Sequence, residues 1–189
     1  LYNKILEINH NHQDANNNLG VIFQKLQQSK RAIKYFQRVI QINPNHADAY
    51  YNLGKIFGEL NENDKAINNY KKAIEINFNQ ADVHNNLGVV FRNIGENQKA
   101  ISCYKIAIKI DPNYVNAYNN LGTILGELNH INESKKIFEK SLNLDPNKIE
   151  TYESYGNILL KLNLHDKALR YIRKSTGFIR FTQKDFEII

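Results

Sequence analysis

Four asparagines recur at an interval of 34 residues, at Asn18, Asn52, Asn86 and Asn120. A further asparagine directly precedes three of them, at Asn17, Asn85 and Asn119. Each asparagine amide offers two hydrogen-bond donors and an acceptor oxygen. A column of such amides, spaced one repeat apart, could pair with the backbone of an extended peptide, largely independently of its sequence. The alternative is a compositional bias, since 29 of the 189 residues are asparagine.

The motifs that would indicate an enzyme are missing from the sequence. It contains no glycine-rich phosphate loop, no Gly-x-Ser-x-Gly and no His-Glu-x-x-His. The 6 histidines are scattered, so we predict no metal site. The single cysteine, Cys103, cannot form an internal disulfide and is interpreted as a small apolar filler of a helix. We therefore expect a non-enzymatic, cytoplasmic protein without a cofactor.

Five glycines keep the same interval, at Gly20, Gly54, Gly88, Gly122 and Gly156. When each repeat is numbered from residues 13, 47, 81, 115 and 149, apolar residues fall at positions 3, 7, 10, 11 and 14. A second apolar set falls at positions 20, 21, 24, 27 and 28. Spacings of three and four mark one stripe of an amphipathic helix. The sequence therefore predicts antiparallel helix pairs, which glycine at position 8 and alanine or serine at position 20 allow to approach closely.

This pattern resembles the tetratricopeptide repeat family, whose period is 34 residues. The matching features are an aromatic residue at position 4 (Tyr50, Tyr118 and Tyr152), Leu-Gly at positions 7 and 8, and proline at position 32. The resemblance covers roughly residues 1–177. It implies an all-α, right-handed superhelical solenoid in which the first helix of each repeat lines a concave groove. Asn16 and His84 depart from the aromatic residue at position 4, and we expect them to weaken the packing locally.

The expected organisation begins with the second half of a truncated repeat, continues through five repeats and ends in a tail. The successive segments are 1–12, 13–46, 47–80, 81–114, 115–148, 149–177 for the degenerate fifth repeat, and 178–189 for the tail. The tail is apolar and strand-like in composition. It is interpreted either as a cover for the fifth repeat or as the beginning of another domain. Self-association of the chain through the exposed ends of the repeat array is a further alternative.

The resemblance places positions 2, 5, 6, 9, 12 and 13 in the groove. The candidate peptide-contacting residues there are Asn17, Asn18, Tyr51, Asn52, Lys55, Asn85, Asn86, Arg92, Asn119, Asn120, Thr123 and Asn157. The groove positions hold seven acids and four bases, a net charge of −3, whereas the whole chain carries +6. The excess of basic residues therefore lies outside the groove.

These charges narrow the class of partner. Basic residues spread over the second helices, without an aromatic platform, argue against specific nucleic-acid binding. No apolar run approaches 18 residues, so we predict no membrane insertion. Some tetratricopeptide domains grip an acidic C-terminal tail with a basic clamp. Positions 2 and 5 hold no lysine here, so that ligand is not expected.

The sequence predicts a protein–protein interaction scaffold that holds an extended or helical peptide segment of a partner in the groove. The asparagine column is also similar to the ladder in the repeat arms of O-linked N-acetylglucosamine transferases. The alternative is therefore the substrate-recruiting arm of a larger enzyme, such as a glycosyltransferase. A catalytic domain encoded after Ile189 would favour that alternative.

Overall fold

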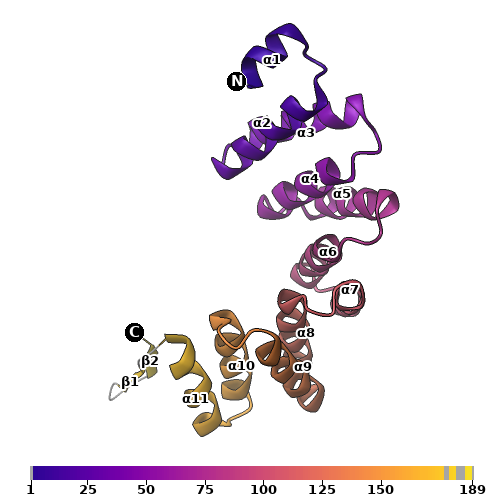
Figure 1. Cartoon of the computed structure of the whole chain (residues 1–189). Coiled ribbons are helices and arrows are strands. Elements are labelled where there is room, and N and C mark those ends of the chain that lie inside the picture. The colour runs from indigo at the N-terminus through magenta and orange to yellow at the C-terminus, as the bar shows by residue number, and fades with distance from the viewer. Residues whose placement is uncertain (1, 177–178, 182–185, 189) are drawn as a thin grey trace. The chain divides into compact units, whose positions relative to one another are not determined.

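The computed structural model describes residues 2–176, 179–181 and 186–188. Within these residues the chain is all-helical apart from two short strands (Figure 1). It forms two compact units, Leu1–Glu96 and Asn97–Ile189. The predicted all-α solenoid of helix pairs is confirmed.

The N-terminal unit is a stack of helix pairs. Its helices are α1 (Tyr2–Ile8), α2 (Gln13–Lys25), α3 (Ser29–Ile42), α4 (Ala47–Glu59), α5 (Asn63–Ile76) and α6 (Ala81–Asn93). Helices α2 and α3 lie side by side, as do α4 and α5 (Figure 1). The first helices also contact one another in series, α2 with α4 and α4 with α6. Together they form one continuous surface, which we name the first-helix face.

The C-terminal unit repeats this plan. Its helices are α7 (Asn97–Ile110), α8 (Val115–Glu127), α9 (Ile131–Leu144), α10 (Ile149–Lys161) and α11 (His165–Thr176). Helix α8 pairs with α9 and α10 with α11, and the contact between α8 and α10 builds the first-helix face of this unit. Strands β1 (Ile179–Phe181) and β2 (Phe186–Ile188) pair antiparallel within the tail, in agreement with its strand-like composition. The remaining tail residues lie outside the described residues.

The turn between the two helices of each repeat depends on one backbone conformation. The φ angle is positive at position 15 of every repeat, at Gln27, Asn61, Gly95, Asn129 and Asn163. Asparagine and glycine tolerate this left-handed region better than other residues. Four of the five repeats therefore carry a residue type suited to the turn, and Gln27 is the exception.

The glycine at position 8 makes room for a side chain from the second helix of its own repeat. A Cβ atom on Gly54 would lie 2.7 Å from the Tyr70 ring, and one on Gly20 would lie 2.7 Å from the Phe36 ring. The expected close approach is confirmed, and the side chain that needs the space stands at position 24. Position 20 adds a hydrogen bond in one repeat, where the Ser134 hydroxyl donates to the Gly122 carbonyl at 2.7 Å.

In four of the five repeats, the side chain at position 4 bonds to the backbone carbonyl group at position 32 of the preceding repeat. The hydroxyl of Tyr118 donates to the Pro112 carbonyl at 3.1 Å. Asn16 Nδ2 donates to the His10 carbonyl at 3.0 Å, and His84 Nε2 lies 3.1 Å from the Phe78 carbonyl. Both departures from the aromatic pattern therefore keep the hydrogen bond and are buried. Weaker packing at Asn16 and His84 stays a prediction, but each side chain does bring a donor to the same carbonyl position that tyrosine reaches in other repeats.

Candidate peptide-binding face

Four of the predicted residues form one connected group on the first-helix face of the N-terminal unit. Asn86 Nδ2 in α6 donates to the hydroxyl of Tyr51 in α4 at 3.2 Å. Asn85 Nδ2 donates to Asn86 Oδ1 at 3.3 Å, and the Lys55 ammonium lies 5.7 Å from the centre of the Tyr51 ring. The structure therefore joins two successive first helices through these side chains.

The surroundings of this group are acidic. Burial raises the pKa of Tyr51, and the nearby carboxylates of Asp82 and Asp48 raise it further, whereas the hydrogen bond from Asn86 lowers it. Gln80 Nε2 donates to Asp48 Oδ1 at 3.2 Å and links the two helix N-termini. Tyr51 therefore stays a neutral hydroxyl at physiological pH and can only donate or accept hydrogen bonds.

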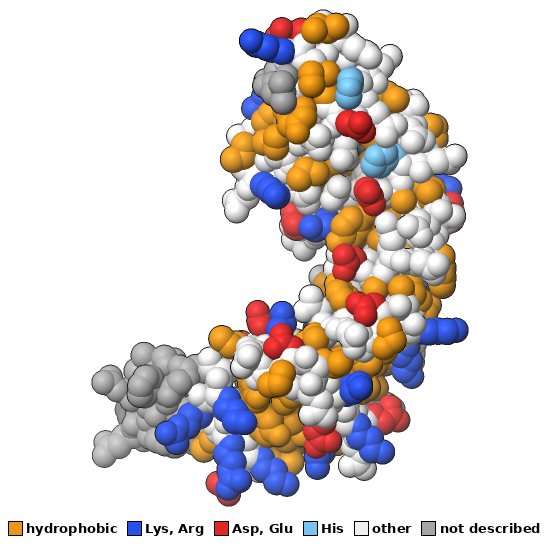
Figure 2. Space-filling view, viewed as in Figure 1, with side chains coloured by type: hydrophobic (Ala, Val, Ile, Leu, Met, Phe, Trp, Pro, Cys, Tyr) orange, Lys and Arg blue, Asp and Glu red, His pale blue; other side chains and the backbone are white. Residues whose placement is uncertain are grey.

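An exposed aspartate stands at position 2 of the first three repeats, at Asp14, Asp48 and Asp82. Each lies in the first turn of its helix, α2, α4 or α6. His12 and His46 precede α2 and α4, where their Nδ1 atoms accept a backbone hydrogen bond at 3.2 Å. Figure 2 shows acidic side chains recurring over the N-terminal helices, with histidines between the first of them. The aspartates favour a ligand with basic rather than acidic groups along this edge.

The asparagines at position 6 differ from one another in their partners. Asn18 and Asn52 are half-buried, and within the described part of the chain neither amide makes a hydrogen bond. Asn86 is engaged by Tyr51 and Asn85, and Asn120 also has an interaction within the protein. The asparagine column therefore has side-chain amides without a partner among the described residues at two successive repeats, on α2 and α4.

Position 5 contributes two buried carbonyl oxygens. Oδ1 of Asn17 and Oδ1 of Asn119 are both enclosed and have no hydrogen-bond partner among the described residues. Leaving a buried acceptor unsatisfied costs about 1–3 kcal/mol. A rotation of either side chain toward a bound backbone N–H group would recover that cost. Both residues were predicted in the groove, but their unsatisfied oxygens leave no signal in the sequence.

The C-terminal unit carries a depression of about 430 Å³ between α8 and α10 on its first-helix face. Its lining includes two predicted residues, Thr123 and Asn157, together with Glu127 and Lys161. The Thr123 hydroxyl donates to the Asn119 carbonyl of its own helix at 2.8 Å. Asn157 is exposed, so its amide is accessible from the depression. Arg92, the remaining predicted residue, is half-buried in α6 and has its own interaction within the protein.

The single thiol of the chain lies inside the helix packing. Burial raises the pKa of the Cys103 thiol to about 11, so it is a neutral group inside α7 at physiological pH. This agrees with its interpretation as a filler of the helix packing. Across residues 2–176 and the two strands, no three His, Cys, Asp or Glu side chains gather as metal ligands. Every described helix is too short or too polar to span a bilayer.

Solved structures with the same arrangement of helices support the fold. A crystal structure of the MamA protein aligns with a TM-score of 0.74 at 24% identity, over 87% of this chain and 90% of that one. PilF of Pseudomonas aeruginosa aligns with a TM-score of 0.78 at 24% identity, over 87% and 75%. YrrB, described as a tetratricopeptide protein with an unusual peptide-binding site, aligns with a TM-score of 0.73 at 19% identity, over 93% and 91%. No curated protein sequence matches the chain.

Sequence models of the tetratricopeptide repeat match the chain in successive segments. The matched residues are 14–46, 35–68, 54–95, 90–129, 115–148 and 149–179. These segments run through all the helix pairs from α2 to α11. Together with the period of 34 and the helix packing, they identify the family. The chain belongs to the tetratricopeptide repeat family.

Proposed function

We propose that this protein is a non-enzymatic interaction scaffold that binds an extended peptide segment of a partner protein along its first-helix face. The observation that carries the proposal is the pair of half-buried amides of Asn18 and Asn52, which have no partner among the described residues. Each amide can donate to a peptide carbonyl and accept from a peptide N–H group. Backbone recognition of this kind selects an extended segment with little regard to its side chains.

The rigidity of the helix pairs favours such binding. Tyr51 and Asn86 hold α4 and α6 together, so the first-helix face is already ordered before a ligand arrives. A preformed surface reduces the entropy that must be lost on binding. The unusual peptide-binding site described for YrrB supports the same use of this fold. The exposed Asp14, Asp48 and Asp82 favour segments that contain lysine or arginine.

The proposal is tested by capture from a random peptide library with the whole chain and with the double variant Asn18→Ala/Asn52→Ala. The loss of each amide should weaken binding by about 0.5–1.5 kcal/mol, as expected for one hydrogen bond. The matched control is Asn68→Ala/Asn143→Ala, which removes two exposed asparagines from the second helices α5 and α9. The control should capture the same peptides as the parent protein.

Two results would contradict the proposal. Equal capture by the parent and by Asn18→Ala/Asn52→Ala would show that the asparagine column does not bind the peptide and reflects only the asparagine-rich composition. Unfolding of that double variant, seen as loss of helical circular dichroism, would show that Asn18 and Asn52 are structural. A peptide that binds the parent and the control, but not Asn18→Ala/Asn52→Ala, supports recognition on the first-helix face.

A further inference from the structure

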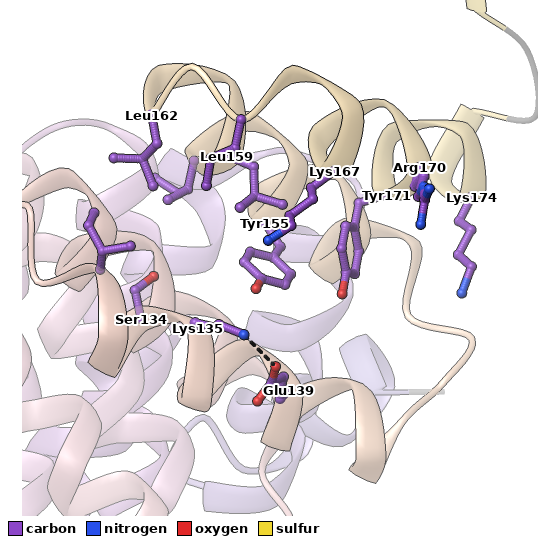
Figure 3. A pocket seen from close by; sticks show the side chains of 13 residues that line it. Ser134, Lys135, Glu139, Tyr155, Leu159, Leu162, Lys167, Arg170, Tyr171 and Lys174 are labelled. Carbon is purple, nitrogen blue, oxygen red and sulfur yellow. Dashed lines mark ion pairs between the residues drawn. The ribbon is translucent and has the colours of Figure 1, made fainter.

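A cavity of about 430 Å³ lies on the other side of the C-terminal unit, between the second helices α9 and α11 (Figure 3). Its lining comes from α9, α10, α11 and the turn before α11, with no residue from α8. The depression on the first-helix face is instead lined by α8 and α10. The two hollows therefore share only helix α10 and lie on different surfaces of the unit. The apolar part of the cavity is formed by Ile131, Ile158, Leu159, Leu162 and Leu164.

Departures from the repeat pattern account for the composition of this cavity. Position 21 is apolar in four repeats and is Lys135 in the fourth, where the side chain is 58% exposed. The Lys135 ammonium extends to Glu139 at 3.8 Å. Positions 16 and 17 are polar in most repeats, yet Leu164 and Ile131 occupy them at the cavity. In the lining of this cavity, Lys135 thus replaces the usual apolar side chain. Leu164 and Ile131 replace the usual polar side chains.

An aromatic wall completes the cavity. The Tyr155 ring stacks on Phe138 at 4.9 Å between centroids and tilts against Tyr171 at 4.5 Å. Figure 3 shows the hydroxyl groups of Tyr155 and Tyr171 directed toward the side of the cavity where Glu139 lies. The remaining repeats carry leucine at position 7, where Tyr155 stands. The wall offers a large apolar surface together with two hydroxyl donors.

The rim of the cavity is basic. It carries Lys135, Lys167, Arg170 and Lys174 against the single acid Glu139. Lys135 pairs with Glu139, and the Lys174 ammonium lies 5.2 Å from the centre of the Tyr152 ring. Lys167 and Arg170 are exposed and make no ion pair or hydrogen bond within the described residues. Figure 2 shows basic side chains gathered over the C-terminal helices with apolar surface between them.

The spacing of the cations on α11 indicates the shape of the ligand. Lys167, Arg170 and Lys174 are three and four residues apart, so they lie along one face of the helix. They cover about 10 Å at a rise of 1.5 Å per residue. An extended peptide covers about 10 Å in three residues. Acidic side chains on such a segment can therefore meet successive cations, which a single small carboxylate cannot do.

We infer that the cavity between α9 and α11 is a second docking site, which binds an acidic peptide segment with one large apolar side chain. The apolar side chain enters the cavity against Tyr155 and Leu159, and its flanking carboxylates meet the cations of α11. Both the surface and the ligand charge differ from those proposed for the first-helix face. The chain would then hold two unlike segments, one along first helices and one between the second helices α9 and α11.

The inference is tested with the whole chain by fluorescence polarisation. The probe is a labelled peptide of about ten residues in which glutamates flank one phenylalanine, long enough to pass the three cations. Exchange of the phenylalanine for serine, or of the glutamates for glutamine, should weaken binding about tenfold or more, because hydrogen bonds to charged groups and a buried ring each contribute at that level. The variant Lys167→Gln/Arg170→Gln should bind the probe more weakly by about the same factor. The change Asn18→Ala/Asn52→Ala should leave the binding constant unchanged.

The matched charge control is Lys105→Gln/Lys109→Gln, which removes two exposed cations from α7 of the same unit. Retained binding by this control, with loss in Lys167→Gln/Arg170→Gln, supports the site. Equal loss in both variants would overturn it in favour of general charge attraction. Unchanged binding of the serine peptide would also overturn it, since the cavity would then play no part. Tighter binding of a single-stranded oligonucleotide to the same cations would assign the surface to nucleic acid and overturn the peptide site.

Discussion

The side-chain amide of Asn86 donates a hydrogen bond to the Tyr51 hydroxyl at 3.2 Å, and this contact joins α6 to α4 across the first-helix face. Asn86 shares its repeat position with Asn18 and Asn52, whose amides have no such partner within the described residues. One repeat position therefore serves two purposes. At Asn86 it holds two helices together, whereas at Asn18 and Asn52 the amide has no partner among the described residues and is proposed to bind a ligand.

This difference predicts opposite effects on stability at equivalent sites. Asn86→Ala removes a half-buried hydrogen bond and should lower the free energy of unfolding by about 0.5–1.5 kcal/mol. Asn52→Ala removes no internal hydrogen bond and should leave that free energy within about 0.5 kcal/mol of the parent, or raise it through the higher helix propensity of alanine. Urea unfolding followed by circular dichroism measures both. Equal destabilisation by the two variants would show that the Asn86–Tyr51 contact contributes nothing.

The buried thiol of Cys103 gives a test of the packing of α7. Burial raises its pKa to about 11, which leaves very little thiolate at pH 8, and the residue is only 8% exposed. Because the thiolate is the reactive species, alkylation by iodoacetamide should be much slower in the native protein than in urea. Mass spectrometry of timed samples measures the two rates. Similar rates in both conditions would place Cys103 on the surface.

Much of the fold could be predicted from the sequence because its signals recur. Apolar residues at spacings of three and four define both helices of each repeat, and the glycine at position 8 marks their close contact. The hydrogen bonds of Asn16 and His84 were not expected from the sequence. Residue type alone suggested weaker packing, but the acceptor that both reach is a backbone carbonyl, which a sequence pattern does not display.

The candidate sites were less accessible to sequence reasoning. The column of asparagines was visible, but the partners that distinguish Asn86 from Asn18 depend on the side chain opposite, in the adjacent helix. Two residues that line the cavity between α9 and α11, Lys135 and Leu164, depart in the sequence from the pattern of the other repeats. Its existence depends on how those side chains pack in three dimensions, and the spacing of residues in the chain does not determine that.

The aromatic wall of this cavity predicts a loss of stability at alkaline pH. Burial, then the neighbouring Tyr171 and Glu139, raises the pKa of Tyr155 from 10.0 to about 12. The folded state therefore holds the phenolic proton more tightly than the unfolded state. The stabilisation is fully present below pH 10 and is lost as the pH rises toward 12. Thermal unfolding followed between pH 8 and pH 12 should show a decreasing melting temperature, with a smaller decrease in Tyr155→Phe; an equal decrease in both proteins would exclude Tyr155 as a source.

Two glycines, Gly58 and Gly126, occupy position 12 of their repeats and differ in their surroundings. A Cβ atom on Gly126 in α8 would lie 2.7 Å from Cγ2 of Ile158 in α10, closer than such atoms can approach. A Cβ atom on Gly58 in α4 would lie 3.7 Å from Cγ2 of Val90 in α6, which is an ordinary contact. Of these two glycines, only Gly126 therefore stands where a Cβ atom would clash with its neighbour.

Alanine stabilises a helix relative to glycine by up to about 1 kcal/mol, so Gly58→Ala should unfold at the same or a higher urea concentration than the parent. Gly126→Ala gains the same propensity but must displace the buried Ile158, and overpacking of this kind costs about 1–3 kcal/mol. It should therefore unfold at a lower urea concentration. Ile158 also lines both the cavity and the depression on the first-helix face, so Gly126→Ala should alter binding at both surfaces. A Gly126→Ala variant as stable as Gly58→Ala would show that α8 and α10 are not in close contact at this point.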